Sequence, residues 1–312
     1  MPKVSVTIPT YNRASLVEEA IRCVLDQTFD DLEIIVVDDG STDNTRSVVE
    51  KYTEKGVKYC YKENGGCASA RNFGLAQCRG QYIAFLDSDD LWPEDFIEIM
   101  LNRLEENPQY GCIYCSVVKM SPDGSQKNSY GPDTCKSGLI TQELFKRSFI
   151  WLQTTLFRKD ALDKFMFDDS LRNGADTDAI LRLSTRIKFL YEPQVKVAFR
   201  ENHGISPRED ISSLNCNRIR VLERFYYRLG GDKYISKRIA THKISHAYRG
   251  VAKNYYKQKC RVAAIELYKQ AIYCLPTDIR LYIGLLKSYR LNAKKDQNPN
   301  WKMSEPLPKI KM

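Results

Sequence analysis

Two pairs of acidic residues follow apolar, strand-like segments of the sequence, where their carboxylates could act as ligands. Asp38 and Asp39 come after LEIIVV (32–37), and Asp87 and Asp89 come after YIAFL (82–86). Carboxylates gathered in one place repel one another unless a cation or hydrogen-bond donors share them. An all-oxygen cluster suits a hard cation such as Mg²⁺ or Mn²⁺. The simpler alternative is that Asp89 and Asp90 only cap a helix that starts near Trp92.

The elements expected around these carboxylates form an α/β fold. Strand-like runs occur at residues 4–9, 32–37, 57–62 and 82–86. Helical segments of about a dozen residues or more separate them, which predicts crossover connections and a mostly parallel sheet with helices on both faces. Ligands bind such sheets at the carboxyl ends of the strands, where the acidic pairs fall. We expect side-chain caps at the first two helix starts, from Asn12 or Ser15 and from Ser41 or Thr42.

The composition is typical of a soluble cytoplasmic protein. The chain has 312 residues, of which 43% are hydrophobic, so it can bury a sizeable core. Its sequence contains no apolar run long enough to span a bilayer, and its N-terminus lacks the shape of a signal peptide. Cys112 and Cys115 form a CxxC in an apolar run with no second cysteine pair, which favours core thiols over a metal or redox site.

The charge divides the chain into two parts. Residues 206–312 carry 23 Lys and Arg against 8 Asp and Glu, a net charge of +15, whereas residues 1–205 have a net charge of −6. This asymmetry predicts a domain boundary near residue 205 and an anionic partner for the second part. We interpret that partner as the inner face of a membrane, contacted peripherally. Nucleic acid is not expected, because no recognised binding motif accompanies the charge. The alternative is that the basic residues only solvate helix surfaces.

Four blocks in the first part carry a resemblance to a known family. VSVTIPTYNRASLVEEAI, LEIIVVDDGSTDNT, ENGGCASARNFGLA and YIAFLDSDDLWPEDF, in this order, cover most of residues 4–96. They resemble the nucleotide-sugar-binding half of the family 2 glycosyltransferases, which have the Rossmann-like GT-A fold. The resemblance implies a GT-A domain over residues 1–205. It also implies an inverting sugar transfer from a nucleotide diphosphate sugar, expected to be UDP-linked, to an acceptor hydroxyl in polysaccharide or glycoconjugate synthesis. The acceptor is expected to be a saccharide, a lipid-linked sugar or a protein.

The resemblance also implies roles for the polar residues at the strand ends. The residues expected to bind the nucleotide sugar are Pro9, Thr10, Tyr11, Asp38, Asp39, Arg71, Asp87 and Ser88. Asp39 would accept a hydrogen bond from the base, and Arg71 would meet the diphosphate. Asp89 and His203 are the expected ligands of a divalent cation, Mn²⁺ or Mg²⁺.

A later motif is expected to supply the acid–base chemistry. LRNGADTDAILRLS (171–184) resembles the acidic motif of the family, and the resemblance makes Asp176 the base that takes the proton of the acceptor hydroxyl. The sequence departs from the family at Ala175, where many members have an acidic residue. Trp151 and Gln153 are expected on the acceptor side.

Each of these assignments has a structural alternative. Tyr11 can be a core aromatic, Asp39 a turn residue, Arg71 a solvated side chain, Asp176 a helix cap and His203 a surface loop residue. Two other function classes also stay open. A sugar-phosphate nucleotidyltransferase would need a glycine-rich, Arg-containing turn where this chain has PTYNRASL, and a non-catalytic helical-repeat protein would not need the acidic residues.

The second part of the chain is expected to be helical from residue 211 to 291. Residues 245–278 fit one tetratricopeptide unit, with the expected residue types at Tyr248, Val251, Ala252, Tyr255, Ala264, Tyr268, Ala271 and Pro276. One repeat cannot bury its own faces, so neighbouring helices are expected to stack on it. The alternative is a helical layer that only packs on the enzyme. Residues 292–312 are polar and contain proline, which predicts a flexible tail.

Overall fold

The computed structural model describes residues 1–121, 125–128, 135–171, 173–200 and 211–291, and only the backbone of residues 126–128 and 211–216. The chain divides into two compact units. One consists of residues 1–140 and 148–206, and the other of residues 141–147 and 207–312.

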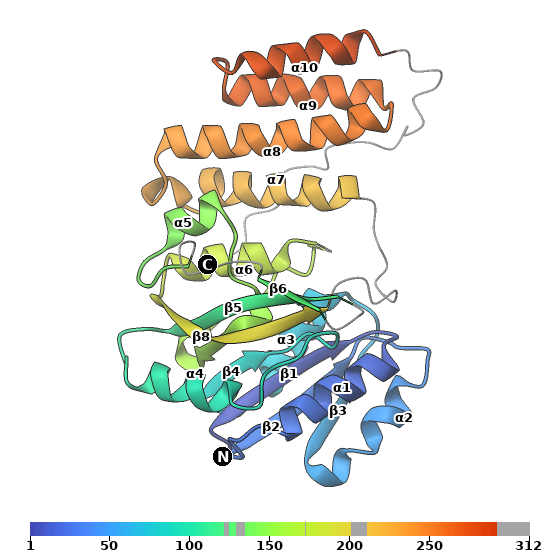
Figure 1. The fold of residues 1–312 in the computed structure, drawn as a ribbon, viewed down its shortest axis with the longest axis vertical. Coiled ribbons are helices and arrows are strands. Elements are labelled where there is room, and N and C mark those ends of the chain that lie inside the picture. Colours follow the sequence, from blue (N-terminus) through green and yellow to red (C-terminus); the bar gives the residue numbers. More distant parts are fainter. Residues whose placement is uncertain (122–124, 129–134, 172, 201–210, 292–312) are drawn as a thin grey trace. The chain divides into compact units, whose positions relative to one another are not determined.

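The first unit is built around an eight-stranded sheet in the order β3-β2-β1-β4-β7-β5-β6, with β8 paired to β5 (Figure 1). The strands are β1 (Val4–Thr10), β2 (Leu32–Asp38), β3 (Val57–Tyr61), β4 (Tyr82–Phe85), β5 (Cys112–Met120), β6 (Gln126–Asn128), β7 (Thr155–Arg158) and β8 (Phe189–Arg200). β1 pairs in parallel with β2 and β4, and β2 pairs in parallel with β3. β7 runs antiparallel to both β4 and β5. The predicted α/β fold with a mostly parallel sheet is confirmed.

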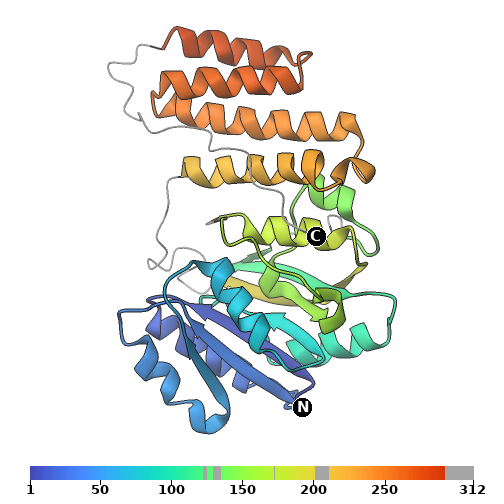
Figure 2. The same ribbon diagram turned by 180° about the vertical axis from the view of Figure 1, so that it is seen from behind.

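Helices connect the strands and cover both faces of this sheet. They are α1 (Ala14–Leu25), α2 (Thr45–Glu50), α3 (Cys67–Gln77), α4 (Phe96–Glu105) and α6 (Ala175–Ser184), with short 3₁₀ helices η1 (Thr53–Lys55), η2 (Leu152–Thr154) and η3 (Lys159–Leu162). Figures 1 and 2 show α1 and α3 on opposite faces. The α1 face holds one hydrophobic core, whose members include Val4, Val6, Ile8, Val17, Ile21, Phe96 and Met100. Alternate residues of β1 supply it because successive side chains of a strand point to opposite faces.

Helix α3 packs unusually close to the other face of the sheet. β1 presents the small residues Ser5 and Thr7 there, both fully buried. A Cβ at Gly74 of α3 would lie 2.4 Å from Thr7 Oγ1 and 3.2 Å from Val37 Cγ2. Only glycine therefore allows this approach. The close packing holds Arg71, one turn earlier in α3, at a fixed place near the strand ends.

The CxxC pair lies in the core of the first unit. Cys112 and Cys115 of β5 are 0% and 2% exposed and are free thiols. Burial raises the pKa of both thiols. Their interpretation as core residues is confirmed.

The second unit is helical in the part that the structure describes. Its elements are α5 (Thr141–Lys146), α7 (Ile211–Arg228), η4 (Gly231–Lys233), α8 (Lys237–Lys257), α9 (Arg261–Cys274) and α10 (Ile279–Tyr289). Figure 1 shows α7 to α10 as successive layers. The apolar and small residues expected in a tetratricopeptide unit, from Tyr248 to Ala271, are all at most 4% exposed. Within the described ranges, no helix has both the length and the apolar character that crossing a bilayer requires.

Candidate functional site

Asp38 is the last residue of β2, and its side chain fixes the turn that follows. It is 1% exposed and accepts hydrogen bonds from the Ser41 N–H and from Tyr59 Oη, both at 2.8 Å. Gly40 makes the turn with φ of 85°, and a Cβ there would lie 2.9 Å from the Asn64 nitrogen. Asp38 therefore holds the loop beside the predicted nucleotide site.

Asp39 joins the end of β2 to the start of α3. It is buried, and its Oδ1 accepts hydrogen bonds from Lys62 Nζ at 2.7 Å and from the Gly65 N–H at 3.0 Å. Its Oδ2 accepts from the Gly66 N–H at 2.7 Å. Three donors therefore orient both carboxylate oxygens. A residue that served only the turn before Gly40 would not need these partners.

The loops after β1 and β2 are tied to each other. Asn12 has φ of 51°, and its Oδ1 accepts hydrogen bonds from the Thr42 N–H at 2.7 Å and the Asp43 N–H at 3.3 Å. The Asn12 N–H donates to Ser41 Oγ at 2.9 Å. The two loops therefore hold each other in place at the edge of the sheet where the acidic residues lie.

Asp43 binds the starts of both helices that follow these loops. Its Oδ2 accepts from the N–H of Ala14, the first residue of α1, at 3.2 Å, and its Oδ1 accepts from the N–H of Thr45, the first residue of α2, at 3.0 Å. Our expectation that these helices are capped by Asn12 or Ser15 and by Ser41 or Thr42 is wrong. Asn12 and Ser41 instead bind across to the opposite loop.

The segment after β4 contains a carboxyl group that is almost fully buried. Asp90 is 1% exposed, and it accepts hydrogen bonds from Gln153 Nε2 at 2.6 Å and from the Arg200 N–H at 3.3 Å. Burial raises the pKa of Asp90 well above its usual range, and the nearby charges of Asp87 and Asp89 act in the same direction. Gln153, expected on the acceptor side, is 2% exposed and donates to Asp90.

Asp89 forms an ion pair with Arg13 and does not cap a helix. Its Oδ2 lies 2.9 Å from Arg13 Nη1. Helix α4 begins only at Phe96. The alternative that Asp89 and Asp90 merely cap a helix near Trp92 is therefore wrong.

Arg71 brings two predicted site residues together. Its side chain is 4% exposed, and Nη2 lies 2.6 Å from Asp87 Oδ1. Nη1 also donates to Asp176 Oδ1, in the first turn of α6. The guanidinium of Arg71 thus bridges carboxylates that are 89 positions apart in the sequence. The alternatives of a solvated Arg71 and a purely capping Asp176 do not account for this contact.

The environment of Asp176 favours a carboxyl that can exchange a proton. Withdrawal from water and the negative charge of Asp87 raise the pKa of Asp176, whereas Arg71 opposes the shift and the Asp176 side chain keeps 39% of its surface exposed. A raised pKa brings a carboxylate closer to the range in which a general base works efficiently.

A hollow of about 390 Å³ opens beside this cluster. Arg71 and Asp176 line it together with Ser148, Ile150 and Trp151. Charged and hydroxyl groups next to an aromatic and an apolar wall are typical of sites for polar organic ligands. Trp151, expected on the acceptor side, is among the residues that line this hollow.

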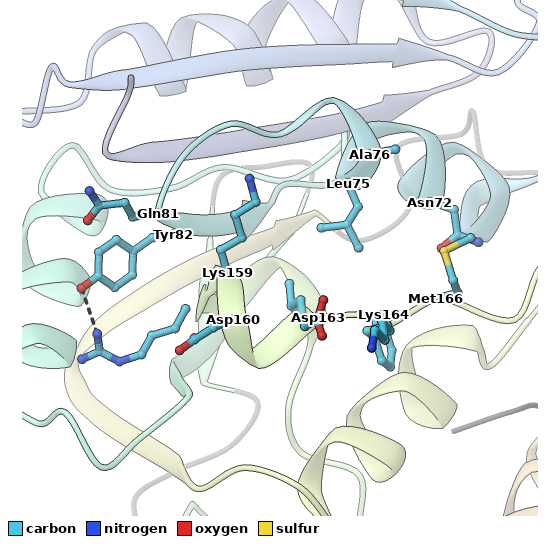
Figure 3. Close-up of a pocket in the computed structure, with 13 residues that line it drawn as sticks. Asn72, Leu75, Ala76, Gln81, Tyr82, Lys159, Asp160, Asp163, Lys164 and Met166 are labelled. Atoms are coloured by element: carbon cyan, nitrogen blue, oxygen red, sulfur yellow. Dashed lines mark hydrogen bonds between the residues drawn. The ribbon is translucent and has the colours of Figure 1, made fainter.

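A larger hollow, of about 740 Å³, lies at the opposite end of β4 (Figure 3). In Figure 3, Gln81 and Tyr82 stand on one side of it and Asn72 and Met166 on the other. Tyr82 is the first residue of β4, whereas the acidic residues follow its last. None of the predicted site residues lines this hollow, so we assign the site to the smaller one.

The acidic residues after β4 fit a divalent cation that a ligand helps to bind. The side chains of Asp87 and Asp89 are 26% and 15% exposed, so solvent and ligand can reach both. Across the residues whose positions are described, no three His, Cys, Asp or Glu side chains form a complete metal site. Mg²⁺ and Mn²⁺ need only one or two carboxylates when phosphate and water oxygens complete the shell. The oxygen donors present therefore fit such an ion.

The remaining predicted residues surround the same sheet edge. Pro9 and Thr10 are buried at the end of β1, and Tyr11, 43% exposed, is not a core aromatic. Among the described residues, Thr10 Oγ1 and Ser88 Oγ are buried without a hydrogen-bond partner. Thr7 Oγ1 and Thr45 Oγ1 share this property, and the hydroxyls of Thr10 and Ser88 differ from them in lying at the strand ends among the predicted site residues. His203 lies outside the described residues.

Three residues of the site were missed from the sequence. Lys62 could have been found, because it follows β3 and parallel strands end at one edge of the sheet. The sequence gives no such signal for Arg13 or Asp90. Arg13 pairs with a residue that is distant in the sequence, and the role of Asp90 depends on its burial against Gln153.

Comparison with known proteins identifies related sequences and folds. A family model described as glycosyl transferase family 2 matches residues 5–166. The chondroitin synthase of Pasteurella multocida (strain Pm70) is 33% identical over 193 residues, which cover 61% of this chain and 20% of the synthase. The match also covers less than a third of the length of three uncharacterized glycosyltransferases, from Rickettsia felis, Rickettsia conorii and Rickettsia bellii.

Solved structures share the fold at low sequence identity. The structure of S. aureus TarS 1–349 in complex with UDP-GlcNAc has a TM-score of 0.58 and 20% identity, covering 92% of this chain and 91% of that one. The mannosyltransferase PcManGT from Pyrobaculum calidifontis, in complex with GDP-Man and Mn²⁺, has a TM-score of 0.53 and 19% identity, covering 93% and 86%.

The tie between the two loops predicts a stability change. We expect Asn12→Ala to lower the free energy of unfolding by about 1–3 kcal/mol, because two N–H groups lose an acceptor and alanine is strained at positive φ. Asn12→Gly loses the same acceptor but is not strained at this positive φ, so it should lose less. Denaturant titration measures the free energy of unfolding of both variants. An unchanged midpoint for Asn12→Ala would show that these hydrogen bonds between the loops do not stabilise the fold.

Proposed function

The chain belongs to glycosyl transferase family 2, and on this premise we propose that it is an inverting, metal-dependent glycosyltransferase that uses a nucleotide diphosphate sugar. The observation that carries the proposal is the bridge from Arg71 to Asp87 and Asp176 beside a hollow at the carboxyl ends of the parallel strands. It joins an anion-binding guanidinium, a donor-side carboxylate and a carboxylate with a raised pKa.

The donor would bind along the strand ends. In our proposal Asp39 accepts a hydrogen bond from the base, with Asp38, Pro9, Thr10 and Tyr11 next to it. The unpaired hydroxyls of Thr10 and Ser88 support a polar ligand here. Arg71 and Asp87 would face the diphosphate and the sugar. UDP is our choice of nucleotide because TarS was solved with UDP-GlcNAc, whereas the GDP-Man of PcManGT is the competing choice.

Asp89, with Asp87 near it and His203 as a further ligand, would hold Mn²⁺ or Mg²⁺. When bound, such an ion neutralises charge on the leaving diphosphate. The Mn²⁺ in the PcManGT structure supports a divalent cation in this fold. Arg13, which pairs with Asp89, would give up that partner when the ion binds.

The transfer itself would depend on Asp176. Its carboxylate takes the proton of the acceptor hydroxyl while that oxygen bonds to the anomeric carbon. The bond from that carbon to the diphosphate breaks, and the diphosphate leaves with the electron pair. Arg71 contacts Asp176, so a diphosphate bound by the same guanidinium would compete with this contact and release the base.

The wider role is proposed from the chain's relatives and its charge. The chondroitin synthase relative supports polysaccharide synthesis, with a saccharide, lipid-linked or protein acceptor. We propose the glycosyltransferase domain at residues 1–205 and a helical region at 206–291. The buried positions of α8 and α9 support a tetratricopeptide-type unit at 245–278.

Membrane contact at the cytoplasmic leaflet is proposed for α10. Its exposed side includes Ile279, Tyr282, Ile283, Leu286 and Tyr289, which are 37% to 68% exposed. Lys287 and Arg290 flank this stripe, and the helix contains no acidic residue. A cationic helix with an exposed apolar face is typical of binding to anionic bilayers.

Replacing the proposed base tests the chemistry. We expect Asp176→Asn to lower the transfer rate by roughly 10² or more with nearly unchanged donor affinity, because the amide cannot accept the proton. Single-turnover transfer and donor titration measure the two effects. The exposed Asp169→Asn is the matched control. Collapse of donor affinity without loss of the transfer rate would make Asp176 a binding residue.

Replacing the proposed metal ligand tests the cation. Asp89→Asn should raise the Mn²⁺ concentration needed for half-maximal turnover and lower the maximal rate by about 10²-fold, because one charged ligand is lost. The exposed Glu94→Gln should leave both values unchanged. Full activity in EDTA would refute metal dependence.

Vesicle co-sedimentation tests the membrane contact. The full chain should bind anionic vesicles more than neutral ones, and less at high salt, because the attraction is screened. Leu286→Ser with Ile283→Ser should reduce binding, whereas Val262→Ser, exposed on α9, should not. Equal weak binding to both vesicle types would leave the charge as a solubility feature.

A further inference from the structure

A hollow of about 320 Å³ in the second unit is lined by hydrogen-bond donors and cations. It lies between α7 and α8, and its lining consists of Arg218, Lys243, His246, Ala247, Gly250, Val251 and Asn254. None of these lining residues is acidic. A guanidinium, an ammonium, an imidazole and an amide therefore face one space without a carboxylate among them.

Among the described residues that line this hollow, none supplies a negative charge to compensate the cations. Lys243 Nζ donates to the carbonyl oxygen of Lys146, which carries only a partial charge. Burial lowers the pKa of Lys243 to about 8, and the positive charges of Arg218 and Arg147 add to the effect. Among the described residues, the Nε2 atom of His246 is buried without a hydrogen-bond partner. An anion in the hollow would relieve the repulsion between these cations.

Small residues on α8 leave room for a ligand. Gly250 lies in the interior of α8, and a Cβ built on it would meet no atom within 4 Å. Glycine is unfavourable inside a helix, and neither crowding nor a positive φ explains it here. The open space above Gly250 is part of the hollow.

We propose that this hollow binds a phosphate group, carried by a soluble phosphate ester or by a lipid headgroup. A tetrahedral dianion offers several acceptor oxygens to Arg218, Lys243, His246 and Asn254 at once, and guanidinium and ammonium groups bind phosphate strongly. The volume leaves space for the group that the phosphate esterifies. The site lies in the second unit and uses none of the residues proposed for sugar transfer. Its test is therefore independent of the test of sugar transfer.

Binding by the full chain tests the site without donor or turnover. Glycerol 3-phosphate is titrated by calorimetry at constant low ionic strength, and saturable binding is expected. Lys243→Gln should weaken it about tenfold, because one charge-assisted hydrogen bond is lost. Gly250→Leu, which removes no charge but fills the space, should weaken it as well. Lys253→Gln, on the exposed side of the same helix, is the control and should bind as the wild type does.

The pH dependence provides an independent readout for Lys243. Arg218 on α7 and Arg147 after α5 stay charged between pH 7 and pH 9, and His246, whose pKa burial lowers from its usual value, stays neutral. A phosphate monoester is a dianion across this range. Loss of the Lys243 proton should therefore weaken binding by the wild type as the pH rises from 7 to 9. Lys243→Arg should retain binding and lose this pH dependence.

A vesicle experiment distinguishes the two sources of phosphate. Vesicles containing phosphatidic acid are compared with pure phosphatidylcholine vesicles. Binding to the former that Lys243→Gln and Gly250→Leu both reduce would assign a lipid headgroup, whereas site-dependent binding of glycerol 3-phosphate alone would assign a soluble ester. The proposal is overturned if neither probe binds saturably, or if Lys253→Gln weakens binding as much as Lys243→Gln while Gly250→Leu has no effect.

Discussion

The buried guanidinium of Arg71 is the interaction on which the candidate site depends. A charged group that is almost fully buried is costly unless partners satisfy it, and here Asp87 and Asp176 both do so. Those carboxylates come from a strand end and from a helix start that no local interaction would bring together. The sheet supplies the first, α6 supplies the second, and α3 carries the cation between them. Loss of Arg71 would leave both carboxylates without this cation, whereas loss of one carboxylate would leave Arg71 with a single anionic partner.

The parallel strands and the candidate residues at their ends could be predicted from the sequence, because both follow from local patterns. Apolar runs that end in Asp38 and Asp87 predict strands, and the carboxyl ends of parallel strands share one edge. The hydrogen bonds that hold the site residues and their loops in place could not be predicted in this way. Asp90 is held by Gln153 and the backbone of Arg200, and Asn12 binds Thr42 and Asp43. These contacts depend on tertiary packing, which has no local pattern. The helix caps were predicted wrongly for the same reason.

The two units differ in how they manage charge. In the first, several buried carboxylates have a cation close by, as Asp39 has in Lys62 at 2.7 Å and Asp178 has in Arg182 at 2.8 Å. In the second, Lys243 is only partly exposed and its charged neighbours Arg218 and Arg147 are cations. The net charge of +15 is therefore more than a property of the surface. Part of it is concentrated where cations repel one another, and this costs stability in the absence of an anion.

The close contact of α3 with β1 and β2 at Gly74 has a consequence for the length of the ligand. The N-terminus of α3 is bound to Asp39 through Gly66, and its second turn is bound to Asp176 through Arg71. An α-helix is stiff over so short a distance. In the proposed arrangement, α3 fixes the distance between the nucleobase at Asp39 and the sugar beside Asp176. Donors that carry one phosphate or three would place their sugar away from Asp176, and the enzyme would select by the number of phosphates before it reads the sugar.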